Sequence, residues 1–520
     1  MSADAGYRWD QDAEGVVTVT MDDPDAAVNT MNAHFVAAFG ATIERLEAER
    51  DGITGVILAS GKDSWFAGGD LVQLRQADPS RSAEETARVE HVKSLLRRLE
   101  LLGRPVVATL TGSALGGGLE VALAAHRRIA ASDAPRARFG LPEVSLGLLP
   151  GGGGIVRTVR MLGLQKALEQ VILPATLFDG AEAVDAGIVD ELVPSADLTA
   201  AARAWIAVNP EPVKPWDEKG FRIPGGGPKE GSVASMLPAM TAQLRAEVGG
   251  APLPAPRAAL AAAVEGAYLD FEAASRVETR YFIHLTHTRV AKNMISAFFD
   301  RQALKTEGGR MGPAPAARAG LIEAVAAVGE GVEPASVEQA ARQAGYRVGA
   351  LRRVDEGALA GDSPGAVVRA DRLAGVAEEV LAWLRDETPR RGDEAPHGFY
   401  EYDEAGEPVR IRADLRERFR SGRAAPALVE LQERMLFADA LEALDRLDEG
   451  VFASVAEANI ASLEAGFPSW TGGALQYMAQ YDGGVAGFAA RAQALADRHG
   501  SRFAPPPSLL RLVEDAGDHA

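Results

Sequence analysis

The sequence predicts an α/β domain followed by a helical half, and three observations carry this prediction. Short apolar runs alternate with helical periods from Val16 to Ala131. After Pro194 come helical stretches with proline-rich breaks. All eight lysines lie at or before Lys305, and beyond it arginine replaces lysine entirely. A chain of 520 residues is also too long for one core, so two or three domains are expected.

The α/β part is predicted from hydrophobic periods that alternate between those of strands and those of helices. Strand–helix–strand repetition predicts a layered sheet with parallel pairing. The expected strands are Val16–Met21, Gly55–Ala59 and Pro105–Leu110, and the expected helices are Phe35–Arg50 and Ala83–Leu102. Further on, Asn209–Trp216 is expected to form a rigid turn and Pro224–Pro228 a loop, because both are rich in proline or glycine.

Composition and an imperfect repeat divide the chain further. Residues 306–317, rich in Gly, Pro and Ala, are the predicted junction. Beyond it, Glu330-Gly331-Val332 recurs as Glu449-Gly450-Val451, which favours two stacked helical units. We therefore predict a core at 1–195, a helical extension with a linker helix at 196–305, and a helical domain at 318–520 made of repeats at about 318–425 and 426–520.

Composition also limits the classes of function. The net charge of −19 argues against nucleic acid as a partner. No apolar run reaches the roughly 18 residues of a membrane span. The absence of cysteine excludes disulfides and thiol catalysis and fits a reducing compartment. Met1–Asp4 lacks the features of a signal peptide, so a cytoplasmic protein is expected.

Two glycine-flanked segments each deliver one glutamate. Gly116–Glu120 precedes an apolar, helix-like stretch, so Glu120 is expected in the first turn of a helix, where free amides collect. There the amide of Gly117 is placed to stabilise negative charge on a carbonyl oxygen. Phe139–Glu143 places Glu143 after a stiffening proline. Paired acids of this kind suit general acid–base chemistry if one keeps its proton near neutral pH.

These segments resemble the crotonase (enoyl-CoA hydratase/isomerase) superfamily, together with Trp65–Leu71 and Leu149–Gly154, over about Val16–Val193. The resemblance implies a crotonase (ClpP-like) α/β fold of stacked ββα units and an acyl-CoA thioester as substrate. It implies an oxyanion hole from the amides of Gly69 and Gly117. It also implies that Glu120 and Glu143 add water to a trans-2-enoyl-CoA. The substrate-binding positions carried over are Ala67, Gly68, Asp70, Leu71, Gly116, Pro142 and Gly151.

The second half resembles the duplicated C-terminal all-α domains of 3-hydroxyacyl-CoA dehydrogenase in the alpha chain of the bacterial multifunctional fatty-acid oxidation complex. Gly398–Tyr402 and Gly466–Gly473 carry this resemblance, and Tyr281–Phe299 resembles the helix that joins hydratase to dehydrogenase. The NAD-binding Rossmann domain expected between them is missing. Gly308–Pro313 has glycines but no preceding strand, so no NAD cofactor is expected.

Several other patterns have two interpretations. Gly151–Gly154 lacks the Lys-Ser/Thr of a P-loop and is expected to be a tight turn near the site. Arg127-Arg128 and Arg136–Arg138 are either a CoA phosphate site or solvated charge. His284 and His287 have helical spacing but no acidic residue close by, so we expect a surface or packing pair and no metal site.

Three functions remain open at this stage. The first is an enoyl-CoA hydratase, motivated by the glutamate pair. The second is a 3,2-enoyl-CoA isomerase, which needs proton shuttling only. The third is a non-redox scaffold, in which the helical half binds a thiolase or a second copy of the chain.

Overall fold

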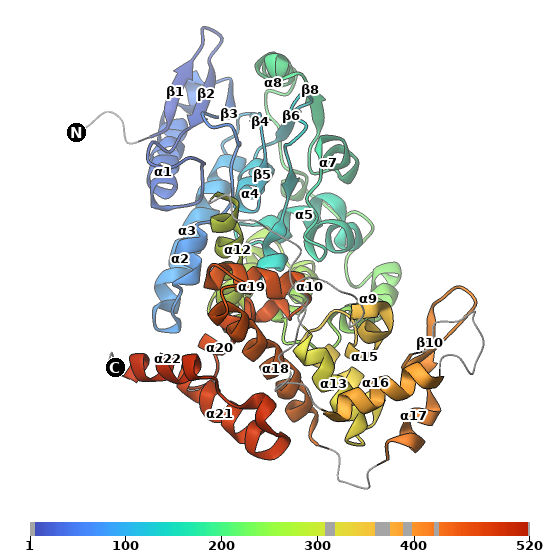
Figure 1. Ribbon diagram of the computed structural model, residues 1–520. Helices are drawn as coiled ribbons and strands as arrows, with labels where there is room; N and C mark the ends of the chain where they lie inside the picture. The colour runs from blue at the N-terminus through green and yellow to red at the C-terminus, as the bar shows by residue number, and fades with distance from the viewer. Residues whose placement is uncertain (1–5, 307–317, 359–374, 388–397, 421–425, 518–520) are drawn as a thin grey trace. The chain divides into compact units, whose positions relative to one another are not determined.

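The computed structural model describes residues 6–306, 318–358, 375–387, 398–420 and 426–517 (Figure 1). The chain forms two compact units. Unit 1 comprises Met1–Leu244 and Pro254–Lys292, and unit 2 comprises Arg245–Leu253 and Asn293–Ala520. The predicted junction at 306–317 and the segment Gly308–Pro313 lie outside the described residues, apart from Thr306, which ends a helix.

Unit 1 is built on a six-stranded sheet of order β1-β2-β3-β4-β6-β8. Only β1 runs antiparallel; the other neighbours pair parallel. Parallel strands bury both faces, and every residue of β4 is buried accordingly. The strands are β1 (Arg8–Gln11), β2 (Val16–Met21), β3 (Gly55–Ser60), β4 (Val106–Leu110), β6 (Arg127–Ala131) and β8 (Glu191–Val193).

Helices cover this sheet. On one face, α8 packs Leu198 and Ile206 against Ile57 and Val107 of the strands. The three predicted strands and two predicted helices of this region are confirmed, with ends within two residues. The helices of unit 1 are α1 (Ala33–Ala48), α2 (Leu71–Arg75), α3 (Ser82–Glu100), α4 (Gly117–Ala124), α5 (Gly154–Leu162), α6 (Leu164–Lys166), α7 (Gly180–Ala186), α8 (Leu198–Val208), α10 (Pro254–Gly266) and α11 (Phe271–Thr286). Two more, α9 (Gly231–Val248) and α12 (Arg289–Thr306), contribute residues to both units.

The expectation of one helix over Tyr281–Phe299 is wrong. α11 ends at Thr286 and α12 begins at Arg289. The hydroxyl of Thr288 accepts a hydrogen bond from the amide of Ala291 at 3.2 Å, so this threonine caps the start of α12. Side chains of this kind compete with helical backbone bonds, which explains the break.

Unit 2 is mainly helical, and a small antiparallel hairpin interrupts the helices. Its strands are β9 (Tyr400–Tyr402) and β10 (Pro408–Ile411). The helices that lie wholly in this unit are α13 (Ala319–Gly329), α14 (Pro334–Ala344), α15 (Ala350–Arg353), α16 (Gly375–Glu387), α17 (Ala413–Arg418), α18 (Leu428–Asp448), α19 (Val455–Glu464), α20 (Ala474–Ala479), α21 (Gly484–His499) and α22 (Pro507–Gly517). No helix in the described ranges is long and apolar enough to cross a membrane.

The sequence repeat has a structural counterpart in unit 2. α13 is followed by Gly331 at φ 93°, and the amide of Val332 reaches back to the carbonyl of Ala327 at 3.0 Å. α18 ends in the same way, with Gly450 at φ 74° and the amide of Val451 bonded to the carbonyl of Arg446 at 2.9 Å. Glycine is required at both turns because side chains disfavour positive φ.

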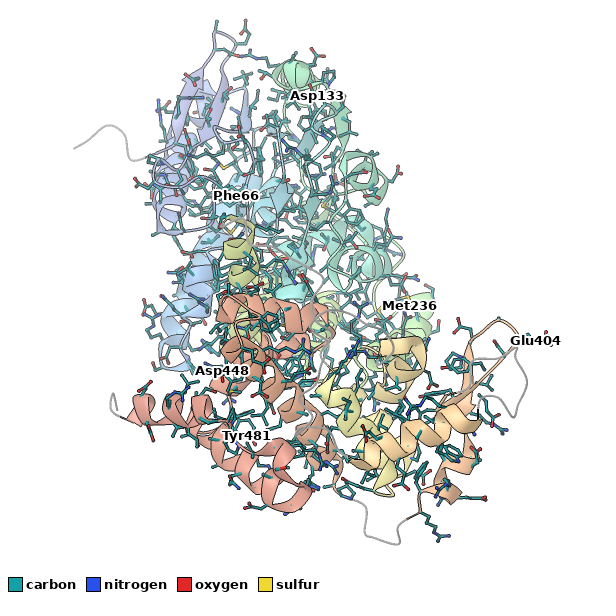
Figure 2. The ribbon with its side chains drawn as sticks, viewed as in Figure 1. Phe66, Asp133, Met236, Glu404, Asp448 and Tyr481 are labelled. Atoms are coloured by element: carbon teal, nitrogen blue, oxygen red, sulfur yellow. The ribbon has the colours of Figure 1, made fainter. Side chains whose placement is uncertain are left out.

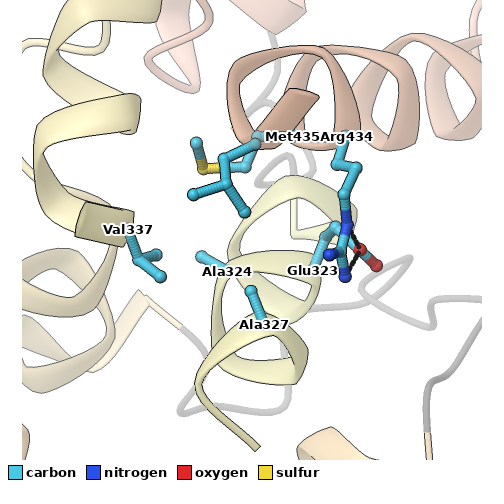
Figure 3. A pocket seen from close by; sticks show the side chains of 7 residues that line it. Glu323, Ala324, Ala327, Val337, Arg434 and Met435 are labelled. Carbon is cyan, nitrogen blue, oxygen red and sulfur yellow. Dashed lines mark hydrogen bonds and ion pairs between the residues drawn. The ribbon is translucent and has the colours of Figure 1, made fainter. Parts of the chain in front are cut away.

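Charged side chains are buried inside unit 2 (Figure 3). The guanidinium of Arg434, on α18, lies 2.5 Å from Oε1 of Glu323, on α13. Arg502 binds the other oxygen of Glu323 at 2.6 Å, and both arginines also contact Glu330. The pocket beside Glu323 and Arg434 is too tight to hold a water molecule, so it is a packing feature of the unit.

Candidate active site

Two very short strands bring the predicted segments of unit 1 together. β5 (Ala114–Leu115) pairs parallel with β7 (Phe139–Gly140), so the residues that follow both strands leave the same edge. The buried Phe66, labelled in Figure 2, forms a parallel bridge with Ala114. Three segments that are distant in sequence, beginning at Phe66, Ala114 and Phe139, therefore lie side by side.

Glycines let the first two of these segments approach each other closely. A Cβ on Gly117 would lie 2.8 Å from Sδ of Met31 and 3.3 Å from the carbonyl carbon of Gly68. Gly68 itself has φ +112°, a conformation that favours glycine. Within the described structure, the amides of Gly69 and Gly117 have no hydrogen-bond acceptor. Two such neighbouring N–H groups can stabilise negative charge that develops on a bound oxygen.

Glu120 lies on α4, as predicted, and its side chain is buried. Its Oε1 accepts hydrogen bonds from the amides of Gly152 and Gly154, each at 2.7 Å. Burial raises the pKa of this carboxyl to about 7, and the charge of Glu278 adds to the rise. The two amide bonds act in the opposite direction, because they stabilise the carboxylate form.

Glu143 faces the same region from the first turn of a 3₁₀ helix, Pro142–Leu146. A Cβ on Gly116 would clash with its Oε1, so the carboxyl lies directly against the start of α4. Its Oε2 is buried and has no partner among the described residues. Burial raises the pKa of Glu143 well above its usual range, and the charge of Glu120 raises it further. Two such carboxyls favour holding a proton near neutral pH.

The remaining predicted positions surround these groups. Asp70 is the N-cap of α2 and accepts the amide of Gln73 at 3.1 Å, so part of its carboxylate is already engaged. Gly151 lies against the ring of Phe282, where a Cβ would come within 2.5 Å. The amide of Ala67 donates to the carbonyl of Asn29, Leu71 opens α2, and Pro142 begins the 3₁₀ helix.

The amides of the glycine run after Leu149 donate hydrogen bonds to carboxylates. Gly152 and Gly154 donate to Glu120, and Gly153 donates to Glu278 at 2.7 Å. These bonds occupy the donors that a phosphate would need, in agreement with the rejection of a P-loop. Sequence reasoning missed Glu278 and its partner Lys93. The available signal was a glutamate on the face of α11 that carries Phe282 and other buried residues.

Two secondary expectations require correction. Arg128 is buried and pairs with Asp190 at 2.7 Å, so the interpretation as solvated charge is wrong for Arg128. Arg127 remains partly exposed and pairs with Glu191 at 3.1 Å. His287 has an acidic neighbour after all, since its Nε2 lies 2.6 Å from Oε2 of Glu85 on α3. The sequence does not indicate this contact, because the two residues are 202 positions apart. Within the described ranges, no three acidic or histidine side chains are grouped to hold a metal.

Comparison with known proteins assigns this part of the chain. Residues 11–209 match the family model described as enoyl-CoA hydratase/isomerase. Residues 11–209 are a crotonase-superfamily domain. The crotonase domain thus includes both glutamates, both candidate oxyanion amides and the glycine loop. Glu278 lies beyond the residues that the family model matches.

Curated relatives of the chain include subunits of a larger assembly. The "fatty acid oxidation complex subunit alpha" of Shewanella amazonensis is 34% identical over 298 residues, covering 57% of this chain and 41% of the relative. The protein of that name from Idiomarina loihiensis is 37% identical over 199 residues, covering 38% of this chain and 27% of the relative. This chain thus spans less than half the length of the curated relatives it matches.

Solved structures that resemble this chain superpose on it with low TM-scores. Human mitochondrial delta3-delta2-enoyl-CoA isomerase is 22% identical, with 57% of this chain and 98% of that chain covered and a TM-score of 0.41. Pseudomonas aeruginosa DspI is 28% identical, with 40% and 76% covered and a TM-score of 0.35.

Proposed function

We propose that this chain is an enoyl-CoA hydratase that adds water to a trans-2-enoyl-CoA and forms a 3-hydroxyacyl-CoA. One observation carries the proposal: two buried carboxyl groups, Glu120 and Glu143, meet beside the unbonded amides of Gly69 and Gly117. The chemistry of the reaction needs both kinds of group. An acyl-CoA substrate also agrees with the family of residues 11–209.

The proposed mechanism uses the two kinds of group in different roles. The oxygen of water forms a bond to the β carbon, and the electrons of the double bond move towards the thioester oxygen. The amides of Gly69 and Gly117 stabilise that oxygen, and losing one such donor costs on the order of 100-fold in rate. One carboxyl orients the water and takes a proton from it, while the other supplies a proton to the α carbon.

The first test follows the loss of enoyl absorbance with purified protein and a panel of trans-2-enoyl-CoA substrates of different chain lengths. We expect turnover of at least one substrate. We expect Glu143→Gln to abolish turnover and to leave the affinity for an acyl-CoA largely unchanged, because the oxyanion amides are backbone groups. A wild-type protein without turnover of any substrate would refute the proposal.

Isomerisation of a 3-enoyl-CoA is the second candidate, because the matched family model covers both activities. Isomerisation moves a proton between two carbons and needs no bound water. If Glu120→Gln left the overall rate intact, the isomerase would be favoured, since the role in activating water would then be dispensable.

We also propose that the chain does not oxidise 3-hydroxyacyl-CoA with NAD. A dinucleotide site needs a strand, a glycine turn and a helix in a parallel unit. The strands described in unit 2 are β9 and β10, which pair antiparallel. Calorimetry should show no saturable NAD binding at millimolar concentration, and NADH formation in protein free of other dehydrogenases would overturn this proposal.

We further propose that the helical half mediates association, with a thiolase or with a second copy of the chain. The names of the curated relatives support a role in a complex. Co-purification from the native source tests this. A monomeric, partner-free protein that hydrates enoyl-CoA would exclude it.

A further inference from the structure

The glycine loop of the active site is held between two carboxylates from two different helices. Its alternate amides face opposite ways: those of Gly152 and Gly154 bind Glu120, and that of Gly153 binds Glu278. Oε2 of Glu278 also accepts the amide of Val156, in the first turn of α5, at 3.0 Å. Gly153 has φ +104°, so this arrangement of amides depends on glycine.

Glu278 is itself firmly held. It is completely buried on α11, and Nζ of Lys93, from α3, lies 3.0 Å from its Oε1. The same ammonium donates to the carbonyl of Ser275 at 2.7 Å and to the hydroxyl of Thr279 at 2.9 Å. One turn after Glu278, the ring of Phe282 packs against Gly151. α11 thus contacts the loop through both a charge and a ring.

The charges around Glu120 and Glu278 come from three further elements. α3 supplies Lys93, and the 3₁₀ helix of residues 142–146 supplies Glu143. α5 supplies Arg157 and Arg160, and α3 also supplies Glu100, which pairs with Arg157 at 2.8 Å. The guanidinium of Arg157 donates to the carbonyl of Gly152 at 3.1 Å and so holds the loop from its other side.

We propose that Glu278 is a positioning residue for this site: it fixes the loop that holds Glu120, and the Lys93–Glu278 pair sets the electrostatic field that Glu120 experiences. Glu278 has this role in catalysis only if the proposed function holds, but the contacts that carry the inference do not depend on it. The field of Glu278 opposes ionisation of Glu120, and that of Lys93 favours it.

The test is a pH titration of Glu120 in the full-length protein, followed by infrared spectroscopy of its carboxyl band. Loss of the band in Glu120→Gln assigns it. We expect Glu278→Gln to lower the midpoint and Lys93→Met to raise it, each by on the order of one pH unit. In the double variant the two effects should largely cancel. Glu272→Gln is the matched control, because it removes an exposed carboxylate of α11 that pairs with Arg97, and it should leave the midpoint unchanged.

A merely structural role predicts a different result. Shifts of both single variants in one direction, or no shift in either folded variant, would overturn the proposal. If Glu278→Gln does not fold, Lys93→Met decides by itself: an upward shift supports the proposal, and no shift contradicts it. The proposed function is tested separately by turnover. A wild-type protein that hydrates nothing but shows the opposite shifts would refute the hydratase and retain the positioning role.

If the protein does hydrate enoyl-CoA, the same variants give a second readout. We expect Glu278→Gln to lower kcat at least tenfold while KM stays within about threefold, because the loop orients a reacting group and leaves the oxyanion amides in place. A loss confined to KM would contradict the positioning role.

Discussion

At the scale of single residues, Gly116 links the segments that carry the two glutamates: its carbonyl accepts the backbone amide of Glu120 at 3.0 Å, and its α carbon lies against the carboxyl of Glu143. It has φ 52° and ψ −125°, a conformation open to glycine alone, and a side chain there would occupy the place of Glu143 Oε1. The local motifs were sufficient to predict that Glu120 lies in the first turn of a helix and that Glu143 follows a proline in a neighbouring segment. They were insufficient for Glu278, which lies 125 residues from the amide of Gly153 that it binds. No short pattern marks a contact of that separation.

Gly116→Ala should therefore lower hydration activity at least 100-fold and destabilise the fold by about 1–3 kcal/mol. The added methyl group displaces Glu143 and strains the backbone. Gly103→Ala is the matched control: Gly103 has φ +70°, but no atom lies within 4 Å of its added Cβ. The control should lose stability only. Equal activity of the two variants would contradict the placement of Glu143.

Glu120→Gln should stabilise the protein at pH 8 by about 1–3 kcal/mol. The pKa of Glu120 is raised to about 7 in the folded state, above its usual value near 4.5. The folded state therefore binds more protons between these two values, and wild-type stability falls as pH rises from 4.5 to 7. Glutamine keeps an oxygen for the amides of Gly152 and Gly154 and has no proton to lose. Denaturant titrations at several pH values measure the difference, which should vanish towards pH 4.5. A difference that does not depend on pH would contradict the burial of a proton-holding Glu120.

At the scale of elements, the strands and helices with clear periods could be predicted, and the shortest ones could not. β5 and β7 have two residues each, too few to show any period, although they align the two glutamate segments. Helix α4, which carries Glu120, is also short, and its C-terminus depends on a distant residue. Nζ of Lys214 donates to the carbonyls of Leu123 and Ala125 at 2.8 and 2.5 Å.

Lys214→Met should destabilise unit 1 by about 1–3 kcal/mol at pH 9, because it removes the lysine donor from two buried carbonyls. The carbonyl of Ala125 keeps the guanidinium of Arg128 as a donor at 3.3 Å, so the loss falls mainly on Leu123. Burial lowers the pKa of Lys214 to about 7 in the folded state, below 10.5. The unfolded state then binds more protons between pH 7 and 10.5, so wild-type stability rises with pH across that range. The gap between wild type and variant should widen from pH 7 to 9, as measured by denaturant unfolding. Lys166→Met, which removes an exposed lysine bonded to the carbonyl of Asp185, is the control and should change little. A constant gap would contradict the capping role.

At the scale of the whole molecule, the chain consists of two units with separate cores. The sequence indicated two halves through the loss of lysine and through the repeat, both of which are properties of long stretches. The chain passes from unit 1 to unit 2 for the last time between Lys292 and Asn293, inside α12. A continuous helix carries no sequence signal at such a point, so this boundary could not be predicted.

Arg434→Met should destabilise unit 2 by about 3–5 kcal/mol, because it leaves Glu323 and Glu330 with less compensation for their burial. Hydration activity should persist at temperatures where unit 2 of the variant has unfolded and unit 1 remains folded. Calorimetric scans with parallel activity assays measure both quantities. Loss of activity together with the unfolding of unit 2, at temperatures where unit 1 remains folded, would contradict the assignment of the chemistry to unit 1.

The central claim is that the glutamate pair adds water to an enoyl-CoA, and isotope incorporation tests it most directly. A trans-2-enoyl-CoA is incubated with the purified chain in ¹⁸O-labelled D₂O, and the product is analysed by mass spectrometry. We predict one ¹⁸O at the β carbon and one deuterium at the α carbon, with neither in Glu143→Gln. Deuterium exchange without ¹⁸O incorporation, or incorporation that survives in Glu143→Gln, would contradict the account.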